Sequence, residues 1–215
     1  MGGGAVGPAT ARDEHPGPCP ACGEPLFGWA VVGSAGAPRT RKYVLDRCEN
    51  CGLGLARDRE GARIVEASEG DVISVPNRRS WQAGIGGGHW GALELPVRTV
   101  YATPQSLELL LGRLGFTGSR IRQPALGRNQ GWMWLTLMNA FTFHDGFARD
   151  LIRGDLTPRT ARSIPAFAAD LVVSMLAALP LALISVPLEL VAVAFRRGGL
   201  IEIAVARRED QTPGH

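Results

Sequence analysis

The sequence predicts an α/β protein with a small four-cysteine module ahead of its main domain. Three observations support this prediction: the cysteines fall into two CxxC pairs, strand-like runs alternate with a capped amphipathic segment, and a long apolar stretch lies near the C-terminus. Hydrophobic residues make up 45% of the 215 residues and charged residues 20%, which excludes a largely disordered chain. The formal net charge of +3 gives no case for nucleic acid as a partner, and none is expected.

The two ends of the chain and one internal segment contain neither the paired cysteines nor the strand and helix patterns. Residues 1–18 are mainly glycine, proline, alanine and charged residues without the apolar core of a secretory signal, so we expect a flexible tail and a cytoplasmic location. We expect residues 56–70 to form a charged connector and residues 209–215 a second tail. The predicted folded parts are therefore residues 19–55 and residues 71–208.

The cysteines are spaced as metal ligands. Cys19 and Cys22 form the first CxxC pair, Cys48 and Cys51 form the second, and 25 residues separate the pairs. Two such turns on adjacent hairpins point four thiolates at one centre, which is the geometry of a structural zinc site. Four protein ligands leave no open position on the ion, so this zinc is expected to be structural and not catalytic. The alternative is two redox-active or free thiol pairs, but no thioredoxin-like βαβ context surrounds them.

The residues around the two pairs fit a zinc ribbon at residues 19–55. Gly23 and Gly52 each follow the second cysteine of a pair, where the turn favours a positive φ. Phe27–Val32 and Lys42–Asp46 have the composition of a strand hairpin. The sequence therefore predicts a zinc-binding β-ribbon.

The following elements can be placed in order. Asp71–Asn77 is a hydrophobic run ended by a Pro-Asn turn and predicts a strand. A helix is expected to begin after Thr103 as N-cap, with Pro104 first, and to end at Gly115. The apolar face of this helix is predicted to consist of Leu107, Leu110, Leu111 and Leu114. Three further elements are predicted: a short strand over Phe116–Gln123, a helix within Trp132–Phe147 and a last strand over Leu200–Ala206.

Several of these segments together resemble a known family. A CPxCG…CxxCGL ribbon, a DVISVPN strand, the run TPQSLELLLGRLGF and the terminal GGLIEIAVARR are similar to zinc-ribbon-containing class I S-adenosylmethionine-dependent methyltransferases, a bacterial arrangement. The resemblance covers residues 19–55 and 71–208. It implies a partial Rossmann-like domain corresponding to the C-terminal half of the methyltransferase fold. It also implies that the last strand lies between the strands at Asp71–Val75 and after Gly115.

The chain departs from the family where the cofactor should bind. The connector 56–70 replaces the whole cofactor-binding half, which would carry a Gly-rich loop and an acidic residue for the ribose hydroxyls. The run Gly84–Gly88 follows the Pro-Asn turn and so stands in the wrong place for that loop. Arg98 stands where the family commonly has His. No cofactor-binding residue is assigned, and a complete S-adenosylmethionine site is not expected.

Two functions from different classes follow. The first is a methyltransferase-like protein, either degenerate or one half of a split enzyme that acts on an apolar small molecule. In the second case a partner chain would complete the sheet, because the lost strands leave an open edge. The alternative is a non-enzymatic, membrane-associated zinc-ribbon adaptor.

Few side chains are candidates for catalysis. His89, beside Trp90, is the candidate general base, with a loop histidine packed on an aromatic ring as the alternative. His144 and Asp145 form a weaker candidate pair, because adjacent residues on a helix do not face each other. Four tryptophans are candidates for lining an apolar substrate pocket or for ordinary packing: Trp81, Trp90, Trp132 and Trp134.

Residues 164–195 form a long apolar segment near the C-terminus. It contains 18 consecutive uncharged residues between Asp170 and Glu189, interrupted by Pro180 and Pro187. Three arrangements remain open: a transmembrane helix, a helical pair split at Pro180 on a membrane surface, and a helical pair that covers a soluble sheet. If the last strand pairs with Asp71–Val75, both ends of the segment lie on the same side of a membrane. We therefore predict an apolar helical pair and expect contact with a membrane.

Overall fold

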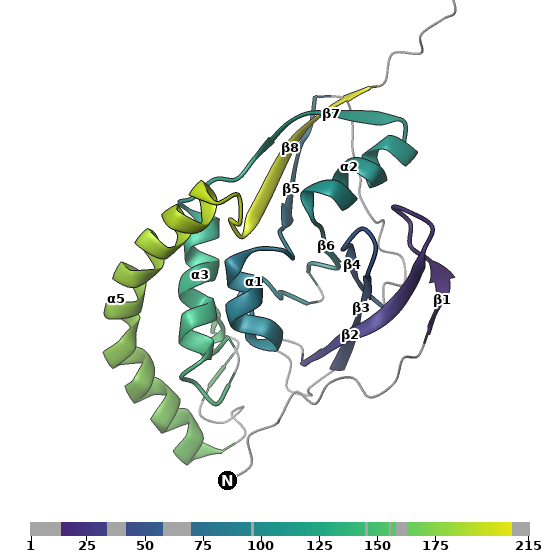
Figure 1. Cartoon of the computed structure of the whole chain (residues 1–215). Coiled ribbons are helices and arrows are strands. Elements are labelled where there is room, and N and C mark those ends of the chain that lie inside the picture. The colour runs from purple at the N-terminus through teal and green to yellow at the C-terminus, as the bar shows by residue number, and fades with distance from the viewer. Residues whose placement is uncertain are drawn as a thin grey trace, which may run out of the picture.

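The fold consists of two antiparallel sheets and a layer of helices (Figure 1). A computed structural model describes residues 14–33, 42–57, 70–95, 97–144, 146–154, 156–157 and 163–207. Its strands are β1 Glu14–Pro18, β2 Pro25–Gly33, β3 Lys42–Cys48, β4 Gly54–Ala56, β5 Val72–Pro76, β6 Val100–Tyr101, β7 Phe116–Arg122 and β8 Leu200–Arg207. Its helices are α1 Trp81–Gly86, the short 3₁₀ helix Gly87–His89, α2 Pro104–Arg113, α3 Arg128–Asn139, α4 Phe147–Arg153 and α5 Ile164–Ala194.

The first sheet contains the predicted ribbon hairpin. Its strand order is β1-β2-β3-β4-β6, and every pairing is antiparallel. The hairpin predicted from Phe27–Val32 and Lys42–Asp46 is confirmed as β2 and β3. The pairing of Leu55 in β4 with Val100 in β6 carries this sheet past the cysteine module into the later part of the chain.

The ribbon sheet extends further toward the N-terminus than the sequence predicts. Glu14–Pro18 belongs to the segment expected to be a flexible tail, yet it forms β1 at the edge of the sheet. A proline-containing segment fits an edge strand, where only one side of its backbone must pair. Most of the expected connector 56–70, residues 1–13 of the expected first tail and the whole expected tail 209–215 lie outside the described residues.

The second sheet has the order β5-β8-β7, with β8 antiparallel to both neighbours. The expected adjacency of the three strands is confirmed. The partial Rossmann-like sheet is not: among the described residues there is no parallel sheet. Parallel neighbours need a crossover of a dozen or more residues, usually with a helix, and here the middle strand instead returns antiparallel after α5.

The far edge of β5 is partly covered by the first sheet. Ala102, just after β6, donates its N–H to the Pro76 carbonyl at 3.0 Å, and the Arg78 N–H donates to Ala102 at 2.9 Å. A parallel bridge joins Asn77 to Ala102. The edge that the resemblance leaves open is therefore closed at its C-terminal end by the ribbon sheet, which limits the exposed part to the start of β5.

Helix α2 forms as predicted. The Thr103 hydroxyl accepts a hydrogen bond from the Ser106 N–H, and Ser106 in turn accepts from the Thr103 N–H, which makes a capping box. Leu107, Leu110 and Leu111 are buried, but Leu114 is 47% exposed because the helix has ended by that point. The helix expected within Trp132–Phe147 instead begins at Arg128 and ends at Asn139, and a separate short helix, α4, begins at Phe147.

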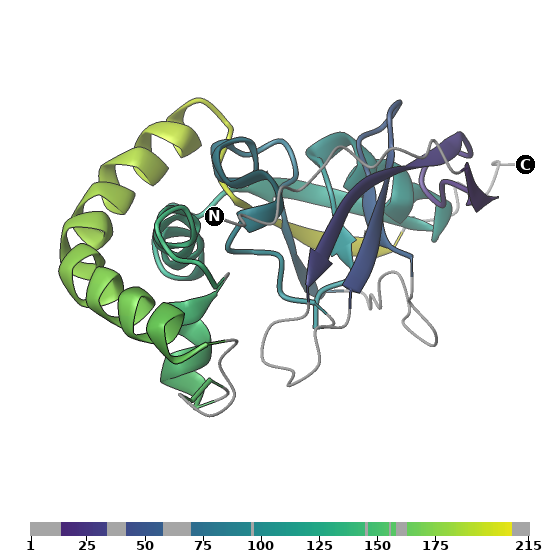
Figure 2. The same ribbon diagram turned by 90° about the horizontal axis from the view of Figure 1, so that it is seen from below.

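The apolar segment forms one helix, not the predicted pair. Helix α5 runs unbroken from Ile164 to Ala194 and includes both Pro180 and Pro187. It curves around α3, as Figure 2 shows. Both prolines lie on its outer, convex face, where a missing N–H bends the helix toward α3 without inserting a ring between the two helices.

The ribbon and the second sheet share one hydrophobic core. The buried cluster contains Cys19 and Cys48 from the ribbon, Leu107 from α2 and Ile201 and Ile203 from β8. A second cluster lies between the first sheet and α3 and includes Trp90 and Trp132. The cysteine module is therefore packed into the body of the molecule and is not a free appendage.

Candidate metal centre

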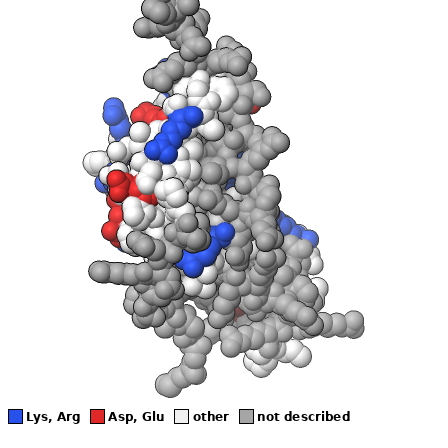
Figure 3. All heavy atoms as spheres, turned by 90° about the vertical axis from the view of Figure 1, so that its right-hand side faces the viewer, with Lys and Arg blue, Asp and Glu red and all other residues white. Residues whose placement is uncertain are grey.

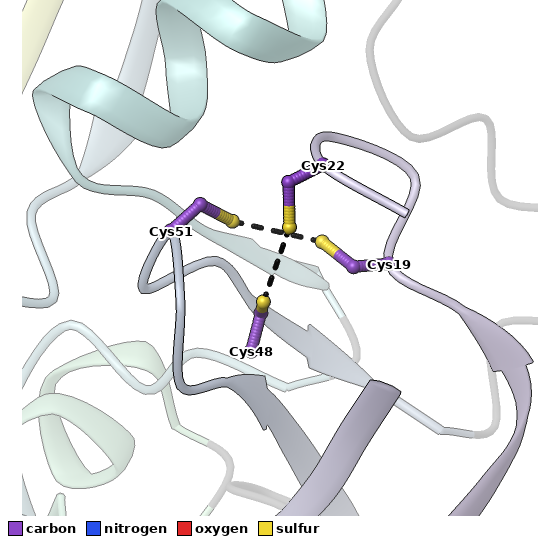
Figure 4. Close-up of side chains that lie close together, drawn as sticks. All are labelled: Cys19, Cys22, Cys48 and Cys51. Carbon is purple, nitrogen blue, oxygen red and sulfur yellow. Dashed lines mark hydrogen bonds between the residues drawn. The ribbon is translucent and has the colours of Figure 1, made fainter. Parts of the chain in front are cut away.

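The four cysteines converge as the sequence predicts. Their Sγ atoms all lie within 4.8 Å of one another, with Cys19 to Cys51 at 3.6 Å and Cys22 to Cys48 at 3.3 Å (Figure 4). An ion with four Zn–S bonds of about 2.3 Å in a tetrahedron requires sulfur atoms about 3.8 Å apart. The cluster therefore fits a structural metal ion such as zinc with only small movements of the side chains.

The two turns that present the cysteines have the same backbone geometry. The Gly23 N–H donates to the Cys19 carbonyl at 2.8 Å, and the Gly52 N–H donates to the Cys48 carbonyl at 3.0 Å. Both glycines have a positive φ, +89° and +79°, as the sequence predicts. Each turn therefore needs a residue without Cβ at this position to aim its two sulfurs inward.

The second turn is fixed to the main domain. The Thr103 hydroxyl donates to the Cys51 carbonyl at 2.8 Å, and Arg78 Nε donates to the Gly52 carbonyl at 2.9 Å. The Arg78 guanidinium also lies 5.1 Å from the centre of the Trp29 ring. Arg113 reaches the first turn and donates to the Pro20 carbonyl at 3.3 Å. Residues far apart in the sequence thus hold both turns in place.

Burial and hydrogen bonds shift the pKa values of three of the thiols in opposite directions. Burial raises the pKa of the Cys19 and Cys51 thiols. At Cys22, desolvation acts in the same direction, but hydrogen bonds from the Glu24 backbone and from the neighbouring thiols outweigh it and lower the pKa to about 7. Cys22 therefore ionises more readily than Cys19 and Cys51, and metal binding must displace the protons of these two buried thiols.

Substitution of Gly52 is expected to damage this centre. A Cβ at Gly52 would lie 2.8 Å from Thr103 Cγ2, and its φ of +79° is unfavourable for other residues. Gly52→Ala should therefore lower the free energy of unfolding by about 2 kcal/mol. The matched control is Gly112→Ala within α2, where the added Cβ meets nothing within 4 Å and should stabilise by about 1 kcal/mol. Urea titrations of both variants measure the difference, and equal stabilities would contradict the assignment.

Comparisons with known proteins assign no family to this chain. A scan of protein-family models and searches of curated proteins and solved structures each find no match to this chain. The family resemblance stated above therefore stays a prediction, and the metal centre is supported by its own geometry.

The candidate general base lies in the short 3₁₀ helix that directly follows α1. His89 is the last residue of the 3₁₀ helix Gly87–His89, its side chain is exposed, and its carbonyl accepts a hydrogen bond from Asn139 at 2.8 Å. Of the preceding glycines, Gly86 packs closely on α3, because a Cβ there would lie 2.6 Å from Thr136 Cγ2, whereas a Cβ at Gly84 or Gly87 would meet nothing within 4 Å. The run Gly84–Gly88 thus forms the end of α1 and the start of this 3₁₀ turn. Close packing against α3 accounts for the glycine at position 86.

The tryptophans and Arg98 have identifiable packing roles. Trp90 and Trp132 are buried in the second core cluster, and the Arg98 guanidinium lies 4.9 Å from the Trp132 ring. Trp81 stacks on Phe195 just after α5, with ring centres 5.8 Å apart. Trp134 Nε1 donates to the Ala178 carbonyl of α5 at 3.0 Å.

His144 has a different partner from the one considered in the sequence. Asp145 lies outside the described residues, and His144 Nε2 is 3.2 Å from Asp150 Oδ2 on α4. Arg149 Nε donates to the other oxygen of Asp150 at 3.1 Å. Although burial acts to raise the pKa of Asp150, the hydrogen bonds and charges of His144 and Arg149 lower it overall. His144 lies in a loop and Asp150 on α4, so the two residues share no helix or strand whose period could have signalled the pair.

A buried carboxylate on α5 was missed altogether. Glu189 is fully buried and accepts hydrogen bonds from Gln82 Nε2 at 2.6 Å, Asn129 Nδ2 at 2.6 Å and the Gly199 N–H at 3.0 Å. Burial raises its pKa despite these donors. This network joins α1, α3, α5 and the turn before β8, and its members come from three distant parts of the sequence.

Proposed function

We propose that this protein is a non-enzymatic adaptor that lies on a membrane surface, with a structural zinc ion stabilising its fold and α5 binding the lipid. The observation that carries this proposal is the outward face of α5, which is long, continuous and entirely apolar. The metal cluster supports the adaptor function because four thiolate ligands leave no coordination position on the ion for a substrate.

The exposed positions of α5 repeat every three or four residues, so they form one stripe along the helix. Ordered along the chain, they are Ile164, Pro165, Ala168, Val172, Met175, Leu176, Leu179, Pro180, Leu183, Ile184, Pro187, Leu190, Val191 and Ala194, followed by Phe195. At 31 residues the helix is about 46 Å long. A stripe of this length exceeds the apolar patches of ordinary monomer surfaces and is typical of an interaction site.

The polarity of α5 is inverted relative to a helix on the surface of a water-soluble domain. Its two charged residues, Asp170 and Glu189, face inward and are at most 2% exposed. Asp170 accepts hydrogen bonds from the backbone N–H groups of Phe143 and His144, at 2.7 and 3.1 Å. Ser174 and Ser185 are also buried on the inner face. Such a helix is stable when its outer face meets an apolar phase.

A surface-lying helix fits the contacts better than a crossing helix. Ile164–Ala194 is long and apolar enough to cross a membrane, with a mean hydropathy of 2.4, and only 11% of its most apolar window is buried. However, α3 packs along it, and the Trp134 and Gln130 side chains of α3 bind its backbone and Ser185. Pro180 also leaves the Leu176 carbonyl without its usual helical donor, which costs less near the headgroups than in the hydrocarbon core.

Flotation with phospholipid vesicles tests the proposal. Wild-type protein is expected to float with vesicles, and Leu179→Asp, which places a carboxylate on the outer face, should weaken binding roughly tenfold or more. The matched control is Leu109→Asp on α2, because Leu109 is 41% exposed and lies away from α5, and it should bind like wild type. Failure of the wild-type protein to float, or equal binding by Leu179→Asp, would contradict the proposal.

A split methyltransferase is the second candidate, and one observation favours it. The order β5-β8-β7 matches the adjacency that the family resemblance implies. Calorimetric titration of S-adenosylmethionine into the zinc-loaded protein in mild detergent should give no saturable heat at about 1 mM ligand if the adaptor function is correct. Saturable one-to-one binding would favour a methyltransferase instead.

A further inference from the structure

The exposed charges of the α3–α4–α5 layer have one sign in the part of the chain that the structure describes. Between Gln123 and Gly199 the described acidic residues are Asp150, Asp170 and Glu189, and each is at most 2% exposed and hydrogen-bonded to internal partners. The exposed arginines of the same stretch are Arg128, Arg153, Arg196 and Arg197. This layer therefore presents positive charge beside the apolar face.

Most of these arginines lie at the C-terminal end of α5. Arg196 and Arg197 directly follow the helix, and Arg197 Nη1 donates to the carbonyl of Arg79, itself exposed, at 3.2 Å. The Arg196 carbonyl accepts from Gln123 Nε2 at 3.3 Å, which brings the loop before α3 to the same place. Arg128 begins α3 one residue before Asn129, which binds Glu189. Three separate chain segments thus supply cations to one end of the apolar stripe.

Aromatic side chains mark both ends of the stripe. At the C-terminal end, Phe195 is 67% exposed and stacks on Trp81. At the N-terminal end, Phe141 and Phe143 are 59% and 83% exposed, and the Phe143 N–H binds Asp170 of α5. Aromatic rings at both ends of an apolar surface are typical of the headgroup region of a bilayer.

The opposite side of the molecule lacks this pattern. Figure 3 shows the side that carries β1 and β2, where described basic and acidic side chains lie near one another. The described charges on this side are therefore mixed in sign, unlike the exposed described charges of the α5 layer.

We infer that the α5 layer binds the surface of an anionic phospholipid bilayer, with its arginines on lipid phosphates and the outer face of α5 inserted at headgroup depth. This inference rests on the proposed membrane function and names the lipid class. Guanidinium groups bind phosphate through paired, charge-assisted hydrogen bonds, which suits arginine more than lysine. Each arginine near an anionic surface contributes about 1 kcal/mol, so three of them give a roughly hundredfold preference over a neutral surface.

The test compares neutral and anionic vesicles at equal lipid concentration. The zinc-loaded full chain is mixed with phosphatidylcholine vesicles and with vesicles containing about 30% phosphatidylglycerol, and the bound fraction is measured by flotation. The inference predicts a roughly hundredfold preference for the anionic vesicles, which added salt reduces because it screens exposed charges. Equal binding to both vesicles overturns the anionic preference and leaves the proposed membrane function intact. Binding to neither overturns both.

A pair of substitutions locates the charge. Arg196 has a φ of 57°, which Asn adopts more readily than most residues, so Arg196→Asn removes the charge without backbone cost. Combined with Arg197→Gln, it should weaken binding to anionic vesicles about thirtyfold and leave binding to neutral vesicles unchanged. The control removes two arginines elsewhere, with Arg47→Gln in β3 and Arg120→Gln in β7, and should retain the preference. An equal loss in the control, or a stable dimer in sedimentation that Leu179→Asp dissociates, would overturn the inference.

Discussion

Cys48→Ser is expected to abolish metal binding and to unfold the protein cooperatively. Cys48 lies in the same buried cluster as Leu107 of α2 and Ile201 of β8, so loss of the centre exposes core and not just a loop. Structural zinc supplies an apparent binding free energy of about 10 kcal/mol or more, and total domain stabilities are about 5–15 kcal/mol. Thermal unfolding followed by circular dichroism should therefore show a folded wild-type protein and no cooperative transition for the variant.

Metal analysis and thiol counting provide the control for this prediction. The chain has four cysteines, and all of them belong to the cluster, so a thiol reagent reports on the centre alone. The native protein should contain one zinc per chain and react slowly, whereas chelation should release four reactive thiols and lower the melting temperature. Adding zinc back should restore the wild type but not the variant. A metal-free native protein with an unchanged melting temperature would refute the structural role.

Glu189→Ala is expected to lower the free energy of unfolding by about 3 kcal/mol. The substitution removes one acceptor from the Gln82 and Asn129 amides, which keep other acceptors, and it removes the acceptor of the Gly199 N–H. A buried donor left unsatisfied costs about 1–3 kcal/mol, part of which water entering the cavity recovers. Chemical denaturation of the zinc-loaded protein measures this change. The matched control is Ser174→Ala on the same inner face of α5. The Ser174 hydroxyl has no hydrogen-bond partner among the described residues, so its removal should change the stability by less than about 0.5 kcal/mol.

The pH dependence separates the charge of Glu189 from its shape. Because burial raises the pKa of Glu189 in the folded state, the folded protein binds this proton more tightly than the unfolded chain does. Its contribution to stability is therefore largest below the ordinary glutamate pKa and is lost as the pH rises through the folded pKa. Glu189→Gln should remove this part of the pH dependence. Parallel pH profiles for wild type and Glu189→Gln would show that the carboxylate does not titrate in the network.

The sequence alone determined the features that depend on local geometry. The CxxC spacing with Gly23 and Gly52 predicted the cysteine cluster, because short turns fix where their sulfurs point. Thr103 and Pro104 predicted the start of α2, because the unsatisfied N–H groups of a first turn need a local acceptor. The strands of the second sheet and their order also followed from the sequence, through hydrophobic runs and the family resemblance.

Only the tertiary structure decided the features that depend on distant partners. Pro180 and Pro187 predict a break by their local chemistry, yet α5 continues because α3 lies along its concave side and both rings point outward. In the local sequence Glu189 only marks the end of an apolar run, but hydrogen bonds from Gln82 and Asn129 hold its carboxylate in the interior. His144 lies 3.2 Å from Asp150 because α4 packs beside the loop that carries the histidine. The Glu189 network is stabilised by hydrogen bonds to partners far away in the chain, which no local pattern encodes. The course of α5 and the His144–Asp150 pair depend on how neighbouring helices pack, which the local sequence does not encode either.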